Sequence, residues 1–239
     1  MEPSTILTLA IEASNPNLPT PGVLLAREGL GVLARAELRQ EGRHDDVLMP
    51  AIAGLLSRAA LKPTDIDEVL VSIGPGGFTA TRLACVSAAV LGELAGACVL
   101  AVPTARVALA SSFVEGSSPG RVVVAMAAKG PETYVARFDA GMHGPWTELG
   151  SIDADTFARN LLPGDVLVHE GHLPELFLEI AARNKIKCIP ICLTAEGLLA
   201  CRRVALAVPA EGLRPIYPRE PDAVTQWRRR YGRAPGDIL

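Results

Sequence analysis

Short apolar runs alternate with amphipathic stretches along this chain, in an order that occurs twice. An apolar run predicts a strand, and a 3.6-residue apolar spacing predicts a helix. The first half is expected to contain strands 6–12, 22–26, 31–38, 68–73 and 97–102, with helices 45–60, 79–95 and 104–112. The second half is expected to contain strands 121–127, 133–139, 145–149, 165–169 and 187–190, with helices 153–160, 174–184 and 195–208. The pattern therefore predicts an α/β protein with two duplicated βββαβαβα halves.

Residues 115–120, EGSSPG, are turn-forming and separate the two halves. We therefore expect one domain over residues 1–112 and a second over residues 113–239. In each half, a three-stranded meander followed by strand–helix alternation predicts a mixed sheet with helices on its faces. Pro50 lies inside the first expected helix and lacks a backbone donor, so a kink or a late helix start is expected there.

The composition is that of a compact protein of one or two small domains. The chain has 239 residues, of which 49% are apolar and 21% charged, and its net charge is −3. This mild acidity argues against tight, autonomous nucleic-acid binding. A local basic cluster occurs near the end of the chain, for which a solvated terminus is the simpler interpretation; its members are Arg228, Arg229, Arg230 and Arg233.

The cysteines and the apolar segments indicate a cytoplasmic protein. The five cysteines lie singly in apolar surroundings without a C-x-x-C pair, so we expect them to be buried and reduced; they are Cys85, Cys98, Cys188, Cys192 and Cys201. The first residues show no basic region before a long apolar core, so no secretory signal is expected. Residues 83–102 are apolar, but they divide better into a buried helix and a short strand than into a membrane span.

A glycine-rich turn follows the strand expected at 68–73. The sequence from Ser72 to Arg82 reads SIGPGGFTATR, with a helix expected next and Thr79 or Thr81 as its cap. Such a turn can point backbone N–H groups at an anion. However, there is no G-x-G-x-x-G, and no Lys-Ser or Lys-Thr follows the glycines. A structural turn is therefore the simpler interpretation, and a phosphate cradle stays open as the alternative.

Four segments in the right order resemble the bacterial TsaB family. GPGGFTATRLA is similar to the GPGSFTGLR signature of that family, and ILTLAIEAS at 6–14 to its opening strand and DTS loop. HDDVLMP at 44–50 resembles H-x-x-x-L-L-P, and RPIYPREPDAVT at 214–225 resembles P-x-Y-x-R-x-P-x-V-T. The resemblance implies the duplicated fold of the actin, sugar kinase and heat-shock chaperone (ASKHA) superfamily. It also implies a role in making threonylcarbamoyladenosine on tRNA.

The resemblance also implies where a nucleotide would lie, between the halves, beside an acidic residue on the first strand. That residue is Glu12 here, where the family pattern has Asp, and Ala127-Ala128-Lys129 replaces D-A-R in the second half. One extra methylene in the side chain is enough to spoil a metal geometry. We therefore expect no cofactor, and a degenerate phosphate-loop-like site made of Glu12, Ser14, Gly74, Gly76, Gly77 and Thr79.

Metal and nucleophile chemistry find little support. The catalytic relatives in the TsaD family use H-x-x-x-H, whereas this chain has His44 followed by Leu48. The run His169-Glu170-Gly171-His172 lacks the spacing of H-E-x-x-H, and no G-x-S-x-G occurs. We expect no metal site and no catalytic residue in this chain.

The helices expected at 45–60 and 79–95 are apolar all round, although a helix on a sheet needs only one apolar face. A helix enclosed in its own domain and a helix that binds a partner both fit this pattern. The resemblance implies that these helices pair with a TsaD-like protein, or with a second copy. The expected interface residues are Val47, Ala51, Leu55, Arg58, Leu83, Val86 and Val90.

We therefore expect a scaffold without catalytic activity of its own. It would bind a TsaD-like catalytic partner, with a TsaE-like ATPase as a third component, and would meet tRNA only through the complex. Two alternatives stay open: a nucleotide-dependent phosphotransferase or hydrolase of the same superfamily, and a divergent homodimeric paralogue with another partner.

Overall fold

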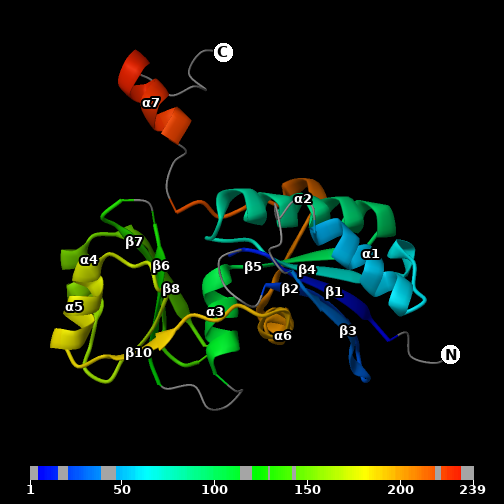
Figure 1. Cartoon of the computed structure of the whole chain (residues 1–239), viewed down its shortest axis with the longest axis horizontal. Helices are drawn as coiled ribbons and strands as arrows, with labels where there is room; N and C mark the ends of the chain where they lie inside the picture. The colour runs from blue at the N-terminus through cyan, green and yellow to red at the C-terminus, as the bar shows by residue number, and fades with distance from the viewer. Residues whose placement is uncertain are drawn as a thin grey trace.

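The computed structural model describes residues 5–15, 21–38, 47–113, 120–128, 130–141, 144–218 and 222–232, apart from the side chains of 222, 223, 225 and 229. These residues form two β-sheets that lie side by side, each with helices on its faces (Figure 1).

The first sheet has six strands in the order β11-β5-β4-β1-β2-β3. The first three strands form an antiparallel meander, and β4 and β5 extend it in parallel on the β1 side. The central strands are buried on both faces, which explains why they are apolar runs rather than alternating patterns. Its strands are β1 (Leu7–Glu12), β2 (Gly22–Arg27), β3 (Gly31–Glu37), β4 (Glu68–Ser72), β5 (Cys98–Val102) and β11 (Leu206–Val208).

The second sheet has five strands in the order β10-β9-β6-β7-β8. This order repeats β5-β4-β1-β2-β3 of the first sheet, with the same antiparallel meander and the same parallel extension. The predicted duplication is thereby confirmed. The strands are β6 (Val122–Ala127), β7 (Thr133–Phe138), β8 (Trp146–Ile152), β9 (Val166–His169) and β10 (Lys187–Pro190).

Two helices cover the outer face of each sheet: α1 and α2 on the first, α4 and α5 on the second (Figure 1). The start of α1 at Leu48 confirms the late start expected from Pro50, and residues 45 and 46 of the predicted helix lie outside the described residues. The α-helices are α1 (Leu48–Arg58), α2 (Phe78–Ala95), α3 (Thr104–Ser112), α4 (Ala154–Asn160), α5 (Glu175–Arg183), α6 (Ala195–Ala200) and α7 (Asp222–Tyr231).

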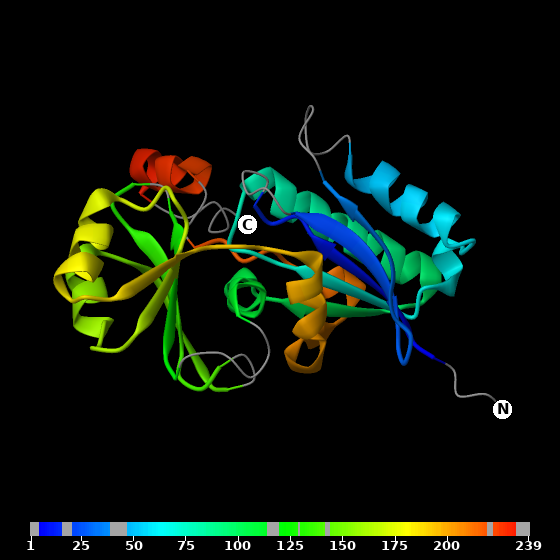
Figure 2. The same ribbon diagram turned by 60° about the horizontal axis from the view of Figure 1, so that its bottom comes forward.

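The third helix of each half packs against the sheet of the other half. Helix α3 contacts β6 and β9, whereas α6 contacts β1, β2 and β4, and the two helices meet between the sheets (Figure 2). A Cβ on Gly197 of α6 would collide with the Ser111 hydroxyl of α3, so the glycine permits the close approach of the two helices. Thr194 donates its backbone N–H to the same hydroxyl at 3.1 Å. One hydrophobic core therefore includes side chains from both halves.

The helix predicted over 195–208 is wrong beyond Ala200. A 3₁₀ turn, η3 (Arg202–Val204), follows α6, and β11 then pairs antiparallel with β5 of the first sheet. The apolar pattern of Leu206–Val208 is compatible with a helix or a strand. The segment forms a strand because it pairs with the edge of β5. The expected boundary between 112 and 113 thus separates the two meanders, but residues 195–208 return to the first sheet. The end of the chain also contains a helix, α7, that the sequence pattern did not predict.

The expectation that all cysteines are buried and reduced is met only in part. All five cysteines are free, but only Cys85 and Cys201 are buried; Cys98 and Cys188 are exposed, so the prediction of uniform burial is wrong.

Helix α2 is long and apolar enough to cross a membrane by length and composition. Its inner face instead packs on β4 and β5, and the predicted division of 83–102 into a helix and a strand is confirmed.

Candidate functional site

The glycine loop joins β4 to α2 and packs against the turn that follows β1. Gly77 is the residue that precedes α2, and it has no side-chain cap, so the expected capping by Thr79 or Thr81 is wrong. The backbone N–H of Gly77 donates to the Ser14 carbonyl at 2.7 Å. The hydroxyl of Thr81 donates to the same carbonyl at 3.4 Å. The Gly77 N–H and the Thr81 hydroxyl are therefore used in hydrogen bonds to Ser14, whereas in a phosphate cradle such donors would point at the anion.

Two glycines of the loop are required by close backbone contacts. Gly74 has a φ of 99°, and a Cβ at this position would lie 2.8 Å from the Ile216 carbonyl oxygen. A Cβ on Gly76 would collide with the Ser14 carbonyl. These contacts explain the glycines by tight packing of backbone on backbone. They favour the structural turn over the phosphate cradle that the sequence left open.

Glu12, the last residue of β1, is fully buried and holds the turn after β1. One carboxylate oxygen accepts hydrogen bonds from the Ser14 N–H at 2.9 Å and from the Ser14 hydroxyl at 2.5 Å. Burial raises the pKa of the Glu12 carboxyl, although the Ser14 hydrogen bonds act in the opposite direction. Burial thus makes the charged form of Glu12 less favourable than it is for an exposed glutamate.

A second buried carboxylate, Glu170, lies directly after β9 in the second half. One of its oxygens accepts from the Asn15 side-chain amide at 2.6 Å, and the other accepts from the Ala127 backbone N–H at 2.7 Å. Burial is the main cause that raises the pKa of Glu170. Asn15 belongs to the turn after β1 and Ala127 ends β6, so Glu170 connects the two halves.

Sequence reasoning noticed Glu170 only as part of the His169–His172 run and missed its role between the halves. The Nδ1 atom of His169 lies 2.9 Å from the Glu170 backbone oxygen, which gives this imidazole a local contact. In the described part of the chain, no three His, Cys, Asp or Glu residues are grouped closely enough to hold a metal ion. His44 and Lys129 lie outside the described residues.

The outer face of α2 is an exposed apolar stripe. Val86, Val90 and Leu94 are 55%, 56% and 59% exposed, and they follow each other at intervals of one helical turn. Phe78 continues the stripe at the start of the helix, and Met49 of α1 is also exposed. We call these five residues the α2 stripe.

The expected interface residues divide into exposed and buried positions. Val86 and Val90 are exposed, as is Arg58, whereas Val47, Ala51 and Leu83 are half-buried. Leu55 has 0% of its surface exposed and belongs to the core beneath α1, so we exclude it from the expected interface. Sequence reasoning missed Met49, Phe78 and Leu94; the four-residue spacing from Phe78 to Leu94 was the signal that could have found the two in α2.

The two halves and their shared core define a duplicated α/β protein of the ASKHA type. Residues 31–165 match the family model described as TsaD: tRNA N6-adenosine threonylcarbamoyltransferase. An uncharacterized protein of Mycobacterium tuberculosis is 32% identical over 218 residues, which cover 90% of this chain and 92% of that protein. The chain therefore belongs to the TsaD family of this model.

The comparisons also place the chain with TsaB and YeaZ. The tRNA threonylcarbamoyladenosine biosynthesis protein TsaB of Bacillus subtilis is 35% identical over 75 residues, 31% of each chain. This chain is similar in structure to the crystal structure of an uncharacterized protein with similarity to peptidase YEAZ from Pseudomonas aeruginosa. The two structures superpose with a TM-score of 0.65, and their sequences are 22% identical. That match covers 90% of this chain and 99% of the other, and it shows a shared fold. The chain is a TsaB/YeaZ-like protein, as the sequence motifs indicated.

Proposed function

We propose that this chain is a scaffold subunit of a complex that threonylcarbamoylates the adenosine next to the anticodon of tRNA. Its membership of the TsaD family and its likeness to TsaB support a role in such a complex. In this proposal the chain binds a TsaD-like catalytic partner through α1 and α2. A TsaE-like ATPase is the third component, and the complex acts in the cytoplasm.

The observation that carries this proposal is the α2 stripe. Three residues of this stripe, Val86, Val90 and Leu94, are large apolar side chains that are more than half exposed at consecutive helical turns, which is unusual on a monomer surface. Full burial of such a side chain from full exposure is worth about 1.5–3 kcal/mol, and roughly half of this remains to be gained at each half-exposed position of the stripe. Its narrow, straight form suits a helix of a partner that lies along α2.

The chemistry belongs to the partner in this proposal. One oxygen of the Glu12 carboxyl group is bonded to Ser14, and the N–H of Gly77 is bonded to the same turn, so these groups contribute to holding the fold. The alternative of a nucleotide-dependent phosphotransferase or hydrolase would need both groups to face a ligand. No contact of the described residues favours that alternative.

The proposal is tested by mixing the chain with the TsaD-like protein of its own organism. Size-exclusion chromatography combined with light scattering then measures whether the two proteins form a hetero-dimer. The test variant is Val90→Glu, which places a charge in the stripe. The matched control is Leu176→Glu on α5, because Leu176 is also about half exposed but lies on the second half. We expect Val90→Glu to weaken the hetero-dimer about 100-fold, since an unpaired charge in an interface costs about 3 kcal/mol.

The control variant should bind the partner as the unmodified chain does. Two unassociated species in the mixture would refute the proposal. A self-dimer that the TsaD-like protein does not displace, and that Val90→Glu dissociates, would instead support the homodimeric alternative. Equal loss of binding in both variants would show that the effect does not come from the α2 stripe.

A further inference from the structure

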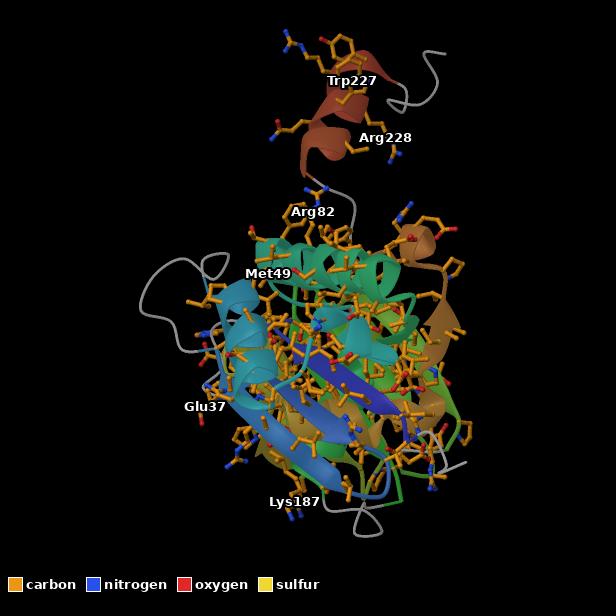
Figure 3. The ribbon with its side chains drawn as sticks, turned by 90° about the vertical axis from the view of Figure 1, so that its right-hand side faces the viewer. Glu37, Met49, Arg82, Lys187, Trp227 and Arg228 are labelled. Carbon is orange, nitrogen blue, oxygen red and sulfur yellow. The ribbon has the colours of Figure 1, made fainter. Side chains whose placement is uncertain are left out.

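Helix α7 carries a pair of aromatic rings next to arginines. Trp227 and Tyr231 lie one helical turn apart, with ring centroids at 4.3 Å and an interplanar angle of 43°. The Arg230 guanidinium lies 5.6 Å from the centroid of the Tyr231 ring. Arg228, Arg230 and Tyr231 are exposed, and α7 projects from the two sheets (Figure 3).

The charge of α7 contrasts with that of the chain. The whole chain has a net charge of −3, whereas α7 has three arginines, all within the stretch 226–231, and one acidic residue, Asp222. Arginines so close together repel one another, and no residue of α7 belongs to the hydrophobic cores of the described residues. Core packing therefore does not explain why a half-buried Trp227, an exposed Tyr231 and exposed cations are combined on this helix.

We propose that α7 binds single-stranded RNA directly. Arginine guanidinium groups attract phosphates and also stack on bases, and exposed Trp and Tyr rings are platforms for bases that are not paired. A duplex presents its phosphates but hides the faces of its bases, so the aromatic pair favours a single strand. The inference adds a direct RNA contact to the proposed function, in which RNA is reached only through the partner.

The composition of α7 argues against two other occupants. A helix that lies on a membrane needs a broad apolar face, and α7 offers only Ala223, Val224, Trp227 and Tyr231. An acidic protein surface would attract the arginines but would leave the rings without a function. RNA uses both kinds of side chain at once.

Fluorescence polarisation with a labelled single-stranded RNA tests the charge component, with the full chain and no partner protein. The test variant is Arg228→Glu/Arg230→Glu. The matched control is Arg183→Glu/Lys187→Glu, which makes the same change of net charge at two exposed residues of the second half. We expect at least about tenfold weaker binding for the test variant and less than twofold for the control. The slope of log affinity against log salt should fall by about 1.4, for two lost phosphate contacts.

Tryptophan fluorescence tests the stacking component. The chain has two tryptophans, so Trp146→Phe leaves Trp227 as the single indole. Trp146 stacks on Phe138 in the second half, and phenylalanine keeps an aromatic ring there. RNA should quench the Trp227 emission. Trp227→Leu/Tyr231→Leu, which changes no charge, should weaken RNA binding at least about tenfold.

Three results would overturn the inference. The first is no RNA binding at about 100 µM protein in 50 mM salt, conditions under which even non-specific binding is measurable. The second is an equal weakening of RNA binding in the test and control variants, and the third is unchanged RNA binding in both α7 variants. If the α7 variants lost the TsaD-like partner but kept RNA binding, α7 would be a protein contact and the inference would be wrong. Val90→Glu separates the two proposals, because it should weaken partner binding about 100-fold and leave RNA binding unchanged.

Discussion

Glu170 accepts a hydrogen bond of 2.6 Å from the Asn15 side-chain amide, and this contact connects the ends of β9 and β1 across the two halves. The other oxygen of Glu170 accepts from the Ala127 N–H, so both carboxylate oxygens are used. At the other side of the same turn, Glu12 is bonded to Ser14. Two buried carboxylates thus hold the turn after β1.

Glu170→Gln should lower the stability of the protein. The amide oxygen replaces only one carboxylate oxygen, so the NH₂ group either faces the Ala127 N–H as a second donor or requires the Asn15 amide to turn over and leave its present orientation. We expect a loss of about 1–3 kcal/mol in the free energy of unfolding, measured by urea denaturation. The control is Glu179→Gln, since Glu179 pairs with Arg183 on the surface of α5 and should contribute less than about 1 kcal/mol. Equal effects of the two substitutions would contradict the role of Glu170.

The contribution of Glu12 and Glu170 to the stability of the protein should fall as the pH rises above about 4.3, the ordinary pKa of a glutamate. Burial raises the pKa of both Glu12 and Glu170 in the folded state. Between the ordinary and the raised pKa, the folded state therefore binds more protons than the unfolded state, and raising the pH favours unfolding.

Glu12→Gln checks this pH dependence, because glutamine resembles the protonated carboxyl group and keeps an oxygen for Ser14. Urea denaturation over about pH 5–8 should show a smaller fall in stability for the variant than for the unmodified chain. Identical slopes for the two proteins would show that Glu12 does not titrate as its burial indicates.

Gly76→Ala should destabilise the fold, because the added methyl group would collide with the Ser14 carbonyl, which is backbone and cannot rotate away. We expect a loss of about 1–3 kcal/mol or more, read from the melting temperature. Gly171→Ala is the matched control, since a Cβ at Gly171 meets nothing within 4 Å. Tolerance of Gly76→Ala would mean that the loop has room for a ligand after all.

The order of strands and helices in both halves could be predicted from the sequence, because each element shows its own apolar period. Gly74 and Gly76 indicated a sharp turn between a strand and a helix, but the sequence left open whether these glycines serve close packing or an anion site. Pro50 likewise indicated the late start of α1, because its missing donor is tolerated only in the first turn.

The tertiary structure alone decided which sheet receives α3 and α6, why 206–208 is a strand, and how Glu170 meets Asn15. It also decided that Leu55 is buried while Val86 and Val90 are exposed. In a helix that is apolar all round, the sequence does not mark the face that meets the sheet. By itself, the sequence determined the elements, the duplication and the family, because these depend on local periods and motifs. The partners of each element depend on contacts between residues far apart in the chain, which no local pattern contains.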